Sequence, residues 1–393
     1  MSTPLNVALV YNIKHEETGE PSTDEGHRSA HRTNDATAVE VAEAQVTRDD
    51  TYAEWDTEET ILAVKSALEQ HHRVSLIEAN GNAYPALAAL RPDIVFNIAE
   101  GLRGPSREAQ IPALLEMLSI PYTGSDPLTL GICLDKSRAK EILAYHRIAT
   151  PSFHVVDSVD GLIGLDLPLP AIVKPLHEGS SKGIMNDSVI RTPAELEEQV
   201  RRVTEQYREP ALVEEFLTGR EFTVALIGNG ASLRVLPIVE IKFDAFPPGT
   251  NPIWSFEAKW MWDTLDQPLD VHECPADISR ELETKIAAVC TRAYELLRCR
   301  DWCRIDVRLD SAGEPHIIEL NPLPGILPNP DEHSCFPQAA RAAGIGYDRM
   351  INMVYFLPLL HGILLLPRPY WACGLVAGLA TGPPLYPCQL REP

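Results

Sequence analysis

Short apolar runs alternate with stretches of helical periodicity over the first third of the chain. The run at 6–11 is typical of a buried strand. Threonines and two acidic residues at 57–60 suit a helix N-terminus, and apolar residues at helical spacing follow. The same patterns predict strands at 74–77 and 93–98, a short helix ending at Leu90, and helices at 111–118 and 134–145. This alternation predicts an N-terminal parallel α/β domain.

Beyond residue 170 the predicted strands become longer and the helices fewer. Strands are expected at 171–174, 211–213, 222–227, 236–241, 302–309 and 316–321, and helices at 193–207 and 278–297. This order predicts an α+β region with a mixed sheet. No internal repeat of fixed period is visible.

Two segments break these patterns. Residues 15–56 are polar and acidic, with few large apolar side chains, which predicts a disordered insertion. Residues 356–393 are apolar but rich in proline, and their uninterrupted apolar stretches are shorter than the ~18–20 residues of a spanning helix. We expect a poorly ordered extension there, with a membrane anchor or an unusual gene end as the alternatives.

The charge balance narrows the range of partners. The 393 residues contain 34 Lys and Arg against 56 Asp and Glu, a net charge of -22, which disfavours binding to nucleic acid or anionic membranes through a basic surface. Residues 15–59 carry 14 acidic and 3 basic side chains, so half of this charge, -11, is local. The start of the chain has no signal-peptide pattern, so we expect a cytoplasmic protein.

The eight cysteines are scattered along the chain. They form no pair or Cys/His group at the spacing of a zinc site. We therefore expect reduced and mostly buried thiols.

The segment 303–321 carries the strongest chemical signal. Its first strand alternates, with Arg304 and Asp306 on the polar face, and its second strand places Glu319 and Asn321 opposite Ile318 and Leu320. A hairpin would make the two carboxylates neighbours, where they repel unless a cation lies between them. Two carboxylates and an amide oxygen suit Mg²⁺. The alternative is a solvated polar face on an edge hairpin.

A second signal is the lysine that ends the strand 171–174 and the Gly/Ser loop that follows it. Lys174 at the end of a buried strand needs an anion, and the loop 179–183 can offer backbone N–H groups to phosphates. The loop lacks the Walker pattern but matches G-x-S-x-G, so a serine hydrolase with Ser181 as nucleophile is a rival interpretation. That rival needs a helix starting at the serine, and the following residues look extended.

Three weaker signals accompany these two. Lys136 and Lys259 each lie in apolar company and could simply extend from the surface. The segment 213–222 joins two predicted strands by a short turn, as in an ordinary hairpin. Gly325, in a Pro-Leu-Pro-Gly exit from the last strand, can offer a backbone N–H near the carboxylates.

Taken in order, these motifs resemble the D-alanine-D-alanine ligase family of the ATP-grasp superfamily. The resemblance covers about residues 90–355 and rests on six segments in the family's order: Ile120 to Ser125, Leu134-Asp135-Lys136, Val173-Lys174-Pro175 with Gly179-Ser180-Ser181, Glu257-Ala258-Lys259, Arg304 to Val307, and Glu319-Leu320-Asn321 with Pro324-Gly325. One such motif is weak evidence, whereas six in sequence are strong evidence.

The resemblance implies a three-part ATP-grasp fold, with an N-terminal α/β domain at 1–125, a central subdomain with a phosphate lid loop at 126–220 and a C-terminal subdomain with the metal site at 221–355. The atypical tail at 356–393 lies beyond the region of resemblance. It also implies an ATP-dependent carboxylate-amine ligase that forms an acyl phosphate and then an amide. D-alanine-D-alanine ligation is the expected activity, and ligation of another amino acid or hydroxy acid is the near alternative. A nucleotide-binding protein without catalysis is the alternative from another class.

The family's functional residues transfer to positions in this chain. ATP would contact the phosphate-binding residues Lys136, Lys174 and Lys259, the lid residues Ser180 and Ser181, the adenine-binding residues Glu214 and Leu217, and the ribose-binding residue Glu221. Asp306, Glu319 and Asn321 would bind two Mg²⁺ ions, with Mn²⁺ as a substitute. Arg304 and the Gly325 N–H would stabilise the oxyanion, and Ser334 would receive the second substrate's carboxylate. The implied partners are amino acids and ATP, with neither nucleic acid nor membrane, and dimers are common in the family.

The departures from the family concern the first amino-acid pocket. The N-terminal glutamate that anchors the first ammonium is missing at 12–14, where the acidic segment begins. A tryptophan, Trp260, replaces the lid tyrosine and cannot accept a hydrogen bond as a hydroxyl can. The family's arginine and glutamate positions near Gly101 are replaced by the sequence 102–108. The ATP half therefore matches well and the first pocket does not.

Overall fold

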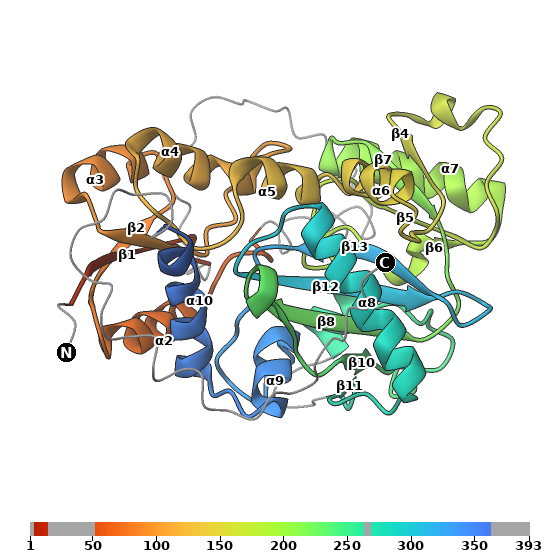
Figure 1. Cartoon of the computed structure of the whole chain (residues 1–393). Coiled ribbons are helices and arrows are strands. Elements are labelled where there is room, and N and C mark those ends of the chain that lie inside the picture. The colour runs from red at the N-terminus through yellow and green to blue at the C-terminus, as the bar shows by residue number, and fades with distance from the viewer. Residues whose placement is uncertain (1–3, 15–51, 263–268, 363–393) are drawn as a thin grey trace, which may run out of the picture.

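The computed structural model describes residues 4–14, 52–262 and 269–362, which form three β-sheets with helices packed on them (Figure 1). One sheet is parallel and two are antiparallel. This combination confirms the expected mixture of α/β and α+β architecture. None of the helices in the described part of the chain has both the length and the apolar character that a membrane crossing requires.

The N-terminal sheet is parallel and has helices on both faces. Its strands lie in the order β2 (Arg73–Glu78), β1 (Asn6–Tyr11), β3 (Ile94–Asn97), and its helices are α2 (Glu58–Glu69), α3 (Ala83–Leu90) and α4 (Gln110–Leu118). Side chains alternate along β1, so Val7 and Leu9 pack with α2 while Ala8 and Val10 pack with α3 and α4. Thr57 caps α2 as the sequence predicts, because its hydroxyl accepts the Thr60 N–H at 3.2 Å.

The central sheet is antiparallel and is covered by one helix. Its order is β4 (Phe153–Val156), β7 (Ala211–Glu215), β5 (Ala171–Pro175), β6 (Val189–Ile190), with α7 (Pro193–Arg202) packed on it. Two helices, α5 (Pro127–Leu134) and α6 (Lys136–Tyr145), precede it in the chain.

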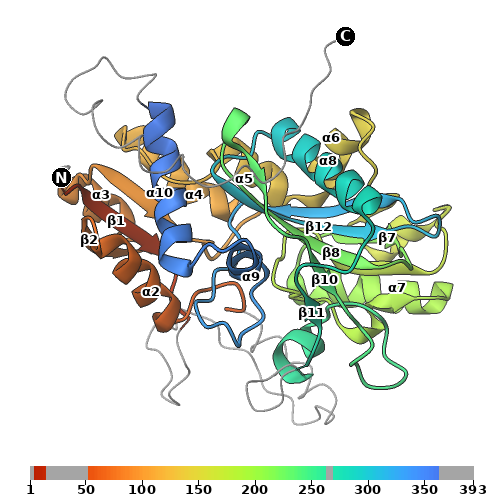
Figure 2. The same ribbon diagram turned by 60° about the horizontal axis from the view of Figure 1, so that its bottom comes forward.

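The C-terminal sheet is the largest. Its order is β11 (His272–Glu273), β10 (Val239–Ile241), β8 (Glu221–Ile227), β12 (Trp302–Leu309), β13 (Pro315–Asn321), and β9 (Arg234–Val235) pairs with β8. The helix α8 (Arg280–Leu296) and α6 pack on one face of this sheet, and α9 (Cys335–Ala342) packs on the other (Figure 2).

Two expectations about strand pairing need correction. The strands on either side of 216–220 belong to different sheets, so this segment is a link between sheets and the expected hairpin at 213–222 is wrong. The hairpin β12–β13 forms as expected, but Ile318 is an extra residue at a β-bulge. Ile317 rather than Ile318 therefore joins Leu320 in the core, because the bulge reverses the alternation of faces at that point.

The ends of the two atypical segments are ordered. Residues 15–51 of the predicted insertion and 363–393 of the predicted tail lie outside the described residues. Tyr52 to Asp56, however, are held by backbone hydrogen bonds between Asp56 and the strand exit at 12–14, so the predicted disorder does not extend to them. The first residues of the predicted tail continue α10 (Tyr347–Gly362) despite Pro358. This helix packs along α2 (Figure 2).

The thiols in the described part of the chain agree with the expectation from spacing. Cys133, Cys290, Cys299 and Cys303 are buried and free, and Cys274 and Cys335 are free and partly buried. Cys373 and Cys388 lie outside the described residues.

A buried aspartate ties the N-terminal domain to the C-terminal sheet. Asp301, just before β12, accepts the Gly124 N–H at 2.7 Å and the Asn229 side-chain amide at 2.7 Å. Its side chain is 3 % exposed. Removing the carboxylate would leave both donors buried without their partner, and each such loss costs about 1–3 kcal/mol.

We predict that Asp301→Ala lowers the free energy of unfolding by about 2–4 kcal/mol, because two buried donors lose an ionised acceptor. Chemical denaturation followed by circular dichroism measures this. Asp160→Ala, at an exposed aspartate, is the matched control and should change stability by less than about 0.5 kcal/mol. Equal stability of the two variants would contradict the assigned role of Asp301.

Candidate active site

The site is organised around two carboxylates that face each other across the hairpin. Asp306 on β12 and Glu319 on β13 are direct cross-strand partners. Thr223 donates to Asp306 at 2.9 Å, and Arg304 donates to the same carboxylate at 3.0 and 3.2 Å. The Asn321 side chain lies 3.3 Å from Asp306 and 3.4 Å from Glu319. The hairpin therefore brings together the three residues expected to bind metal.

The electrostatics of the pair are unequal. Burial raises the pKa of Asp306, and the neighbouring Glu319 adds to this while Arg304 opposes it. Burial also acts to raise the pKa of Glu319, but the charges of Lys136, Lys174 and Arg304 outweigh it and lower that pKa to about 2. Two carboxylates and an amide in one partly buried cluster fit the hard, oxygen-preferring cations Mg²⁺ and Mn²⁺.

Lys136 and Lys174 reach the same cluster from two other elements. Lys136 begins α6 directly after its N-cap, and its Nζ lies 3.7 Å from Glu319 and 2.5 Å from the Glu178 carbonyl oxygen. Lys174 on β5 lies 3.2 Å from Glu214 on β7. Burial opposes the charge of Lys174, but Glu214 and Glu319 outweigh it and raise the pKa of this lysine.

Lys259 lies in a π-helical turn, Ala258–Trp262, which directly follows Glu257. The carboxylate of Glu257 accepts the Asn186 N–H at 3.0 Å, which fixes this turn against the end of the lid loop. Burial, followed by the charge of Arg304, lowers the pKa of Lys259 to about 8.

A buried lysine that the sequence analysis did not single out joins the helix α6 to the central sheet. Lys140 on α6 is 1 % exposed, and its Nζ lies 3.2 Å from Glu214 and 2.8 Å from the Thr150 hydroxyl. Burial lowers the pKa of Lys140 to about 8. The charges of Lys140 and Lys174 lower the pKa of Glu214 although Glu214 is buried. The only sign of Lys140 in the sequence is its helical spacing from Lys136, which places both lysines on the same side of α6.

The lid loop contains two serines with left-handed backbone conformations. Ser180 and Ser181 have φ values of 49° and 60°, and Gly183 has 72°. The Ser181 hydroxyl donates to the Trp254 carbonyl oxygen at 2.6 Å. No helix starts at this serine, since α7 begins only at residue 193, so the geometry of a serine-hydrolase nucleophile is absent from this loop.

The link between the two antiparallel sheets holds the residues expected near a nucleoside. Leu217 is buried in this link, and Glu221 opens β8 just after it. Arg308 donates to Glu221 at 2.7 Å, which orients the carboxylate. The residues expected to contact adenine and ribose thus lie on the last strand of the central sheet, on the link, and on the first strand of the C-terminal sheet.

Gly325 and Ser334 lie on the loop that follows β13. The Ser334 hydroxyl donates to the Gly325 carbonyl oxygen at 3.1 Å and accepts the Leu327 N–H at 3.2 Å. These bonds hold Gly325 and Ser334 together on one loop, and the next residue, Cys335, lies close enough to Arg304 and Asp306 for their charges to act on its pKa.

The structure also adds residues that the sequence analysis had missed. Glu54, near the end of the acidic segment 15–56, contacts both Arg107 and the lid loop. Arg107 donates to both Glu54 carboxylate oxygens at 2.7 Å and to Glu178 at 3.3 Å, and Glu54 also accepts the Gly179 N–H at 2.7 Å.

These contacts join the lid loop to the N-terminal domain. A side chain at position 179 would place its Cβ 2.6 Å from the Glu54 carboxylate, so the Glu54 side chain would have to move away from the Gly179 N–H to make room. No spacing rule predicts this contact, because Glu54 and Gly179 are 125 residues apart.

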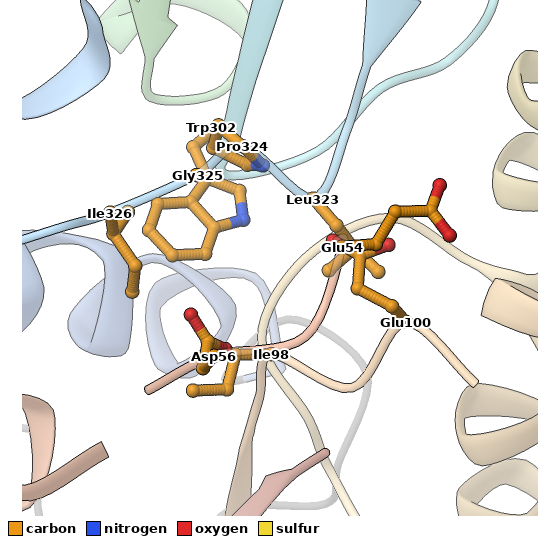
Figure 3. Close-up of a pocket in the computed structure, with 9 residues that line it drawn as sticks. All are labelled: Glu54, Asp56, Ile98, Glu100, Trp302, Leu323, Pro324, Gly325 and Ile326. Carbon is orange, nitrogen blue, oxygen red and sulfur yellow. The ribbon is translucent and has the colours of Figure 1, made fainter. Parts of the chain in front are cut away.

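A cavity lies beside Gly325, with about 280 Å³ of space between its lining residues when its opening to solvent is included. Figure 3 shows its walls, with Glu54, Asp56 and Glu100 from the N-terminal domain facing Trp302 and the exit loop. Its lining residues are Glu54, Asp56, Ile98, Glu100, Trp302, Leu323, Pro324, Gly325 and Ile326. The cavity therefore lies against the exit loop, which directly follows the strand β13 that carries Glu319.

Comparisons with known proteins agree with this geometry. A family model described as the D-ala D-ala ligase C-terminus matches residues 154–355. A Sinorhizobium fredii protein named "Uncharacterized protein y4sG" is 37% identical over 263 residues, 66% of this chain and 72% of its own. A Bordetella petrii D-alanine–D-alanine ligase is 34% identical over 274 residues, 69% of this chain and 78% of its own.

The solved structures extend the comparison to the fold. The crystal structure of a D-alanine–D-alanine ligase from Bacillus anthracis complexed with ATP has a TM-score of 0.62 and 20% identity, covering 92% of this chain and 100% of its own. This likeness confirms the expected ATP-grasp fold. The chain belongs to the D-alanine–D-alanine ligase family and is an ATP-dependent ligase.

Proposed function

We propose that the protein phosphorylates the carboxylate of one amino acid with ATP and joins the acyl group to the amine of a second. The products are a dipeptide, ADP and phosphate. The observation that carries this proposal is the convergence of the facing carboxylates Asp306 and Glu319 with Lys136 and Arg304, beside the cavity at Gly325.

ATP would lie between the central and C-terminal sheets. Lys136, Lys174 and Lys259 would hold its phosphates. Glu214 and Leu217 would contact the adenine through backbone groups, and the carboxylate of Glu221 would bind the ribose hydroxyls. Lys140 supports this arrangement because it shares the carboxylate of Glu214 with Lys174, which keeps the base of the cleft charged and ordered.

The lid loop would close over the phosphates and exclude water from the acyl phosphate. The backbone at Ser180 and Ser181 is already turned by their positive φ angles, and Glu54 holds the adjacent Gly179 N–H. The lid is therefore attached to the wall of the amino-acid cavity, which supports closure over both substrates together.

Asp306, Glu319 and Asn321 would hold two Mg²⁺ ions, with Mn²⁺ as a substitute. When bound, these ions neutralise the charge that moves with the γ-phosphoryl group. The low pKa of Glu319 supports this, because the side chain is ionised and ready for a cation at neutral pH.

The second half-reaction would use the exit loop. Attack of the amine on the acyl phosphate creates an oxyanion, which Arg304 and the Gly325 N–H would stabilise. Ser334 would receive the carboxylate of the second amino acid, and its hydrogen bond to Gly325 supports this because it places the two groups on one rigid loop.

The relatives' names give D-alanine as the reference substrate. We take D-alanine as the first substrate to test for both positions, and we place the reaction in the cytoplasm, where ATP and free amino acids are present. We also propose that the domains of the chain end at residues 125, 220 and 355. We further propose that the protein forms a homodimer.

We predict that Glu319→Gln lowers kcat for amino-acid-dependent ADP release by roughly a hundredfold or more, because one of the two facing carboxylates is lost. A coupled ADP assay with D- and L-amino acids and Mg²⁺, followed by mass spectrometry of products, measures this. Glu314→Gln is the matched control, since Glu314 lies in the turn of the same hairpin, 55% exposed and paired with Lys285. If no amino-acid pair stimulates ADP release while ATP still binds, the protein is a nucleotide-binding protein without ligase activity.

We predict an alkaline limb near pH 8 in kcat/KM for ATP. Lys259, with its pKa lowered to about 8, is charged below that pH and loses its attraction for phosphate above it. Lys259→Arg keeps the charge at all these pH values, so the limb should move above pH 9. A limb that stays at pH 8 in this variant would show that another group, such as the buried Lys140, controls the profile.

A further inference from the structure

The cavity beside Gly325 has more carboxyl groups in its wall than one amino-acid ammonium requires. Three of its lining residues are carboxylates, Glu54, Asp56 and Glu100. A fourth, Glu108, lies close enough to Glu100 to raise the pKa of that group further. Among the described residues whose contacts are given, Arg107 is the one cation of this wall. The carboxylates that pair with Arg107 therefore decide which carboxylates are left for a ligand.

Arg107 is occupied by carboxylates other than Asp56 and Glu100. It donates to both oxygens of Glu54 at 2.7 Å and to Glu178 at 3.3 Å. It is 5 % exposed, so this pairing is shielded from water and is retained.

Asp56 and Glu100 form no ion pair within 4.0 Å and no side-chain hydrogen bond with any described residue. Burial is the largest cause that raises the pKa of each, to about 7 for Asp56. Carboxylates in this state gain free energy when a cation enters beside them, because the cation offsets both the lost hydration and their mutual repulsion.

A second, independent observation concerns a polar atom in the Trp302 side chain. The indole Nε1 of Trp302 has no hydrogen-bond partner among the described residues, although Trp302 is 1 % exposed. Trp302 lines the cavity across from Asp56 (Figure 3). A buried N–H without an acceptor is costly, and an oxygen of a bound ligand would satisfy it.

We propose that the first substrate of the ligase is a diamino acid, whose α-ammonium and second ammonium bind the carboxylates of Asp56 and Glu100 while its carboxylate lies toward Gly325. This proposal rests on the proposed function, since it names the substrate class of the same site. A neutral amino acid such as alanine supplies only one cation and leaves one of these carboxylates unpaired.

The test isolates the first substrate by trapping its acyl phosphate with hydroxylamine. The nitrogen of hydroxylamine attacks the carbonyl carbon, the bond from that carbon to the phosphate oxygen breaks, and inorganic phosphate leaves as the nitrogen loses a proton. The full chain is assayed with ATP, Mg²⁺ and hydroxylamine for hydroxamate and ADP. The probes are 2,4-diaminobutyrate against 2-aminobutyrate, and ornithine against norvaline, each as D and L forms, with D-alanine as reference.

We expect kcat/KM for 2,4-diaminobutyrate or ornithine to exceed that of its neutral counterpart by about tenfold or more, since a buried charge pair is worth at least that factor. Glu100→Gln should lower this ratio several-fold. The matched control Glu141→Gln, at a 52% exposed carboxylate paired with Arg138, should leave the ratio unchanged.

Two variants keep the test decisive. If Glu100→Gln fails to fold, as judged by circular dichroism, Asp56→Asn replaces it, and the ratio in the parent protein already tests the preference. A ratio of about one or below in the parent protein overturns the proposal. A preference that is unchanged in both variants overturns its assignment to these carboxylates.

Failure of the proposed function looks different. If no tested amino acid, including D-alanine, yields hydroxamate or stimulates ADP release, then the ligase mechanism fails and this inference fails with it. If D-alanine or 2-aminobutyrate is activated with a kcat/KM equal to that of the diamino acids, the ligase mechanism holds and only the proposed substrate class is wrong.

Discussion

The face-to-face placement of Asp306 and Glu319 is the constraint on which the site depends. Two partly buried carboxylates in cross-strand contact repel, and the positive groups around them offset this repulsion. Each surrounding element contributes one: Arg304 from the same strand, Lys136 from the start of α6, and Lys174 from the central sheet. The three-dimensional arrangement of the sheets is therefore coupled to this cluster, because separating them would leave the carboxylates unbalanced.

A second cluster connects the lid to the amino-acid cavity. Glu54 binds Arg107 and the Gly179 N–H at the same time, so one carboxylate contacts both the N-terminal domain and the phosphate loop. The wall behind it keeps Asp56 and Glu100 without a cation. In the proposed function, ATP and the amino acid would be held by opposite charge patterns, with lysines on one side and carboxylates on the other. This contrast separates the nucleotide end of the site from the substrate end.

Most of the regular elements could be predicted because their signals are local. The strands at 6–11, 302–309 and 315–321 and the cap at Thr57 follow from side-chain alternation and capping chemistry. The errors arose where pairing depends on distant parts of the chain. The strands on either side of 216–220 enter different sheets, and a bulge at Ile318 changes which side chains face the core. Neither feature changes the local hydrophobic pattern.

The sequence alone determined the chemistry of the nucleotide side, because its lysines, carboxylates and Gly/Ser loop lie in compact motifs whose order identifies the family. The tertiary structure decided the substrate side. Glu54, Arg107 and Trp302 come from segments far apart in the chain, and only the packing of the N-terminal domain against the C-terminal sheet brings them around one cavity. The physical reason is that burial and pairing determine the charge of such a cavity, and both depend on contacts that no local pattern encodes.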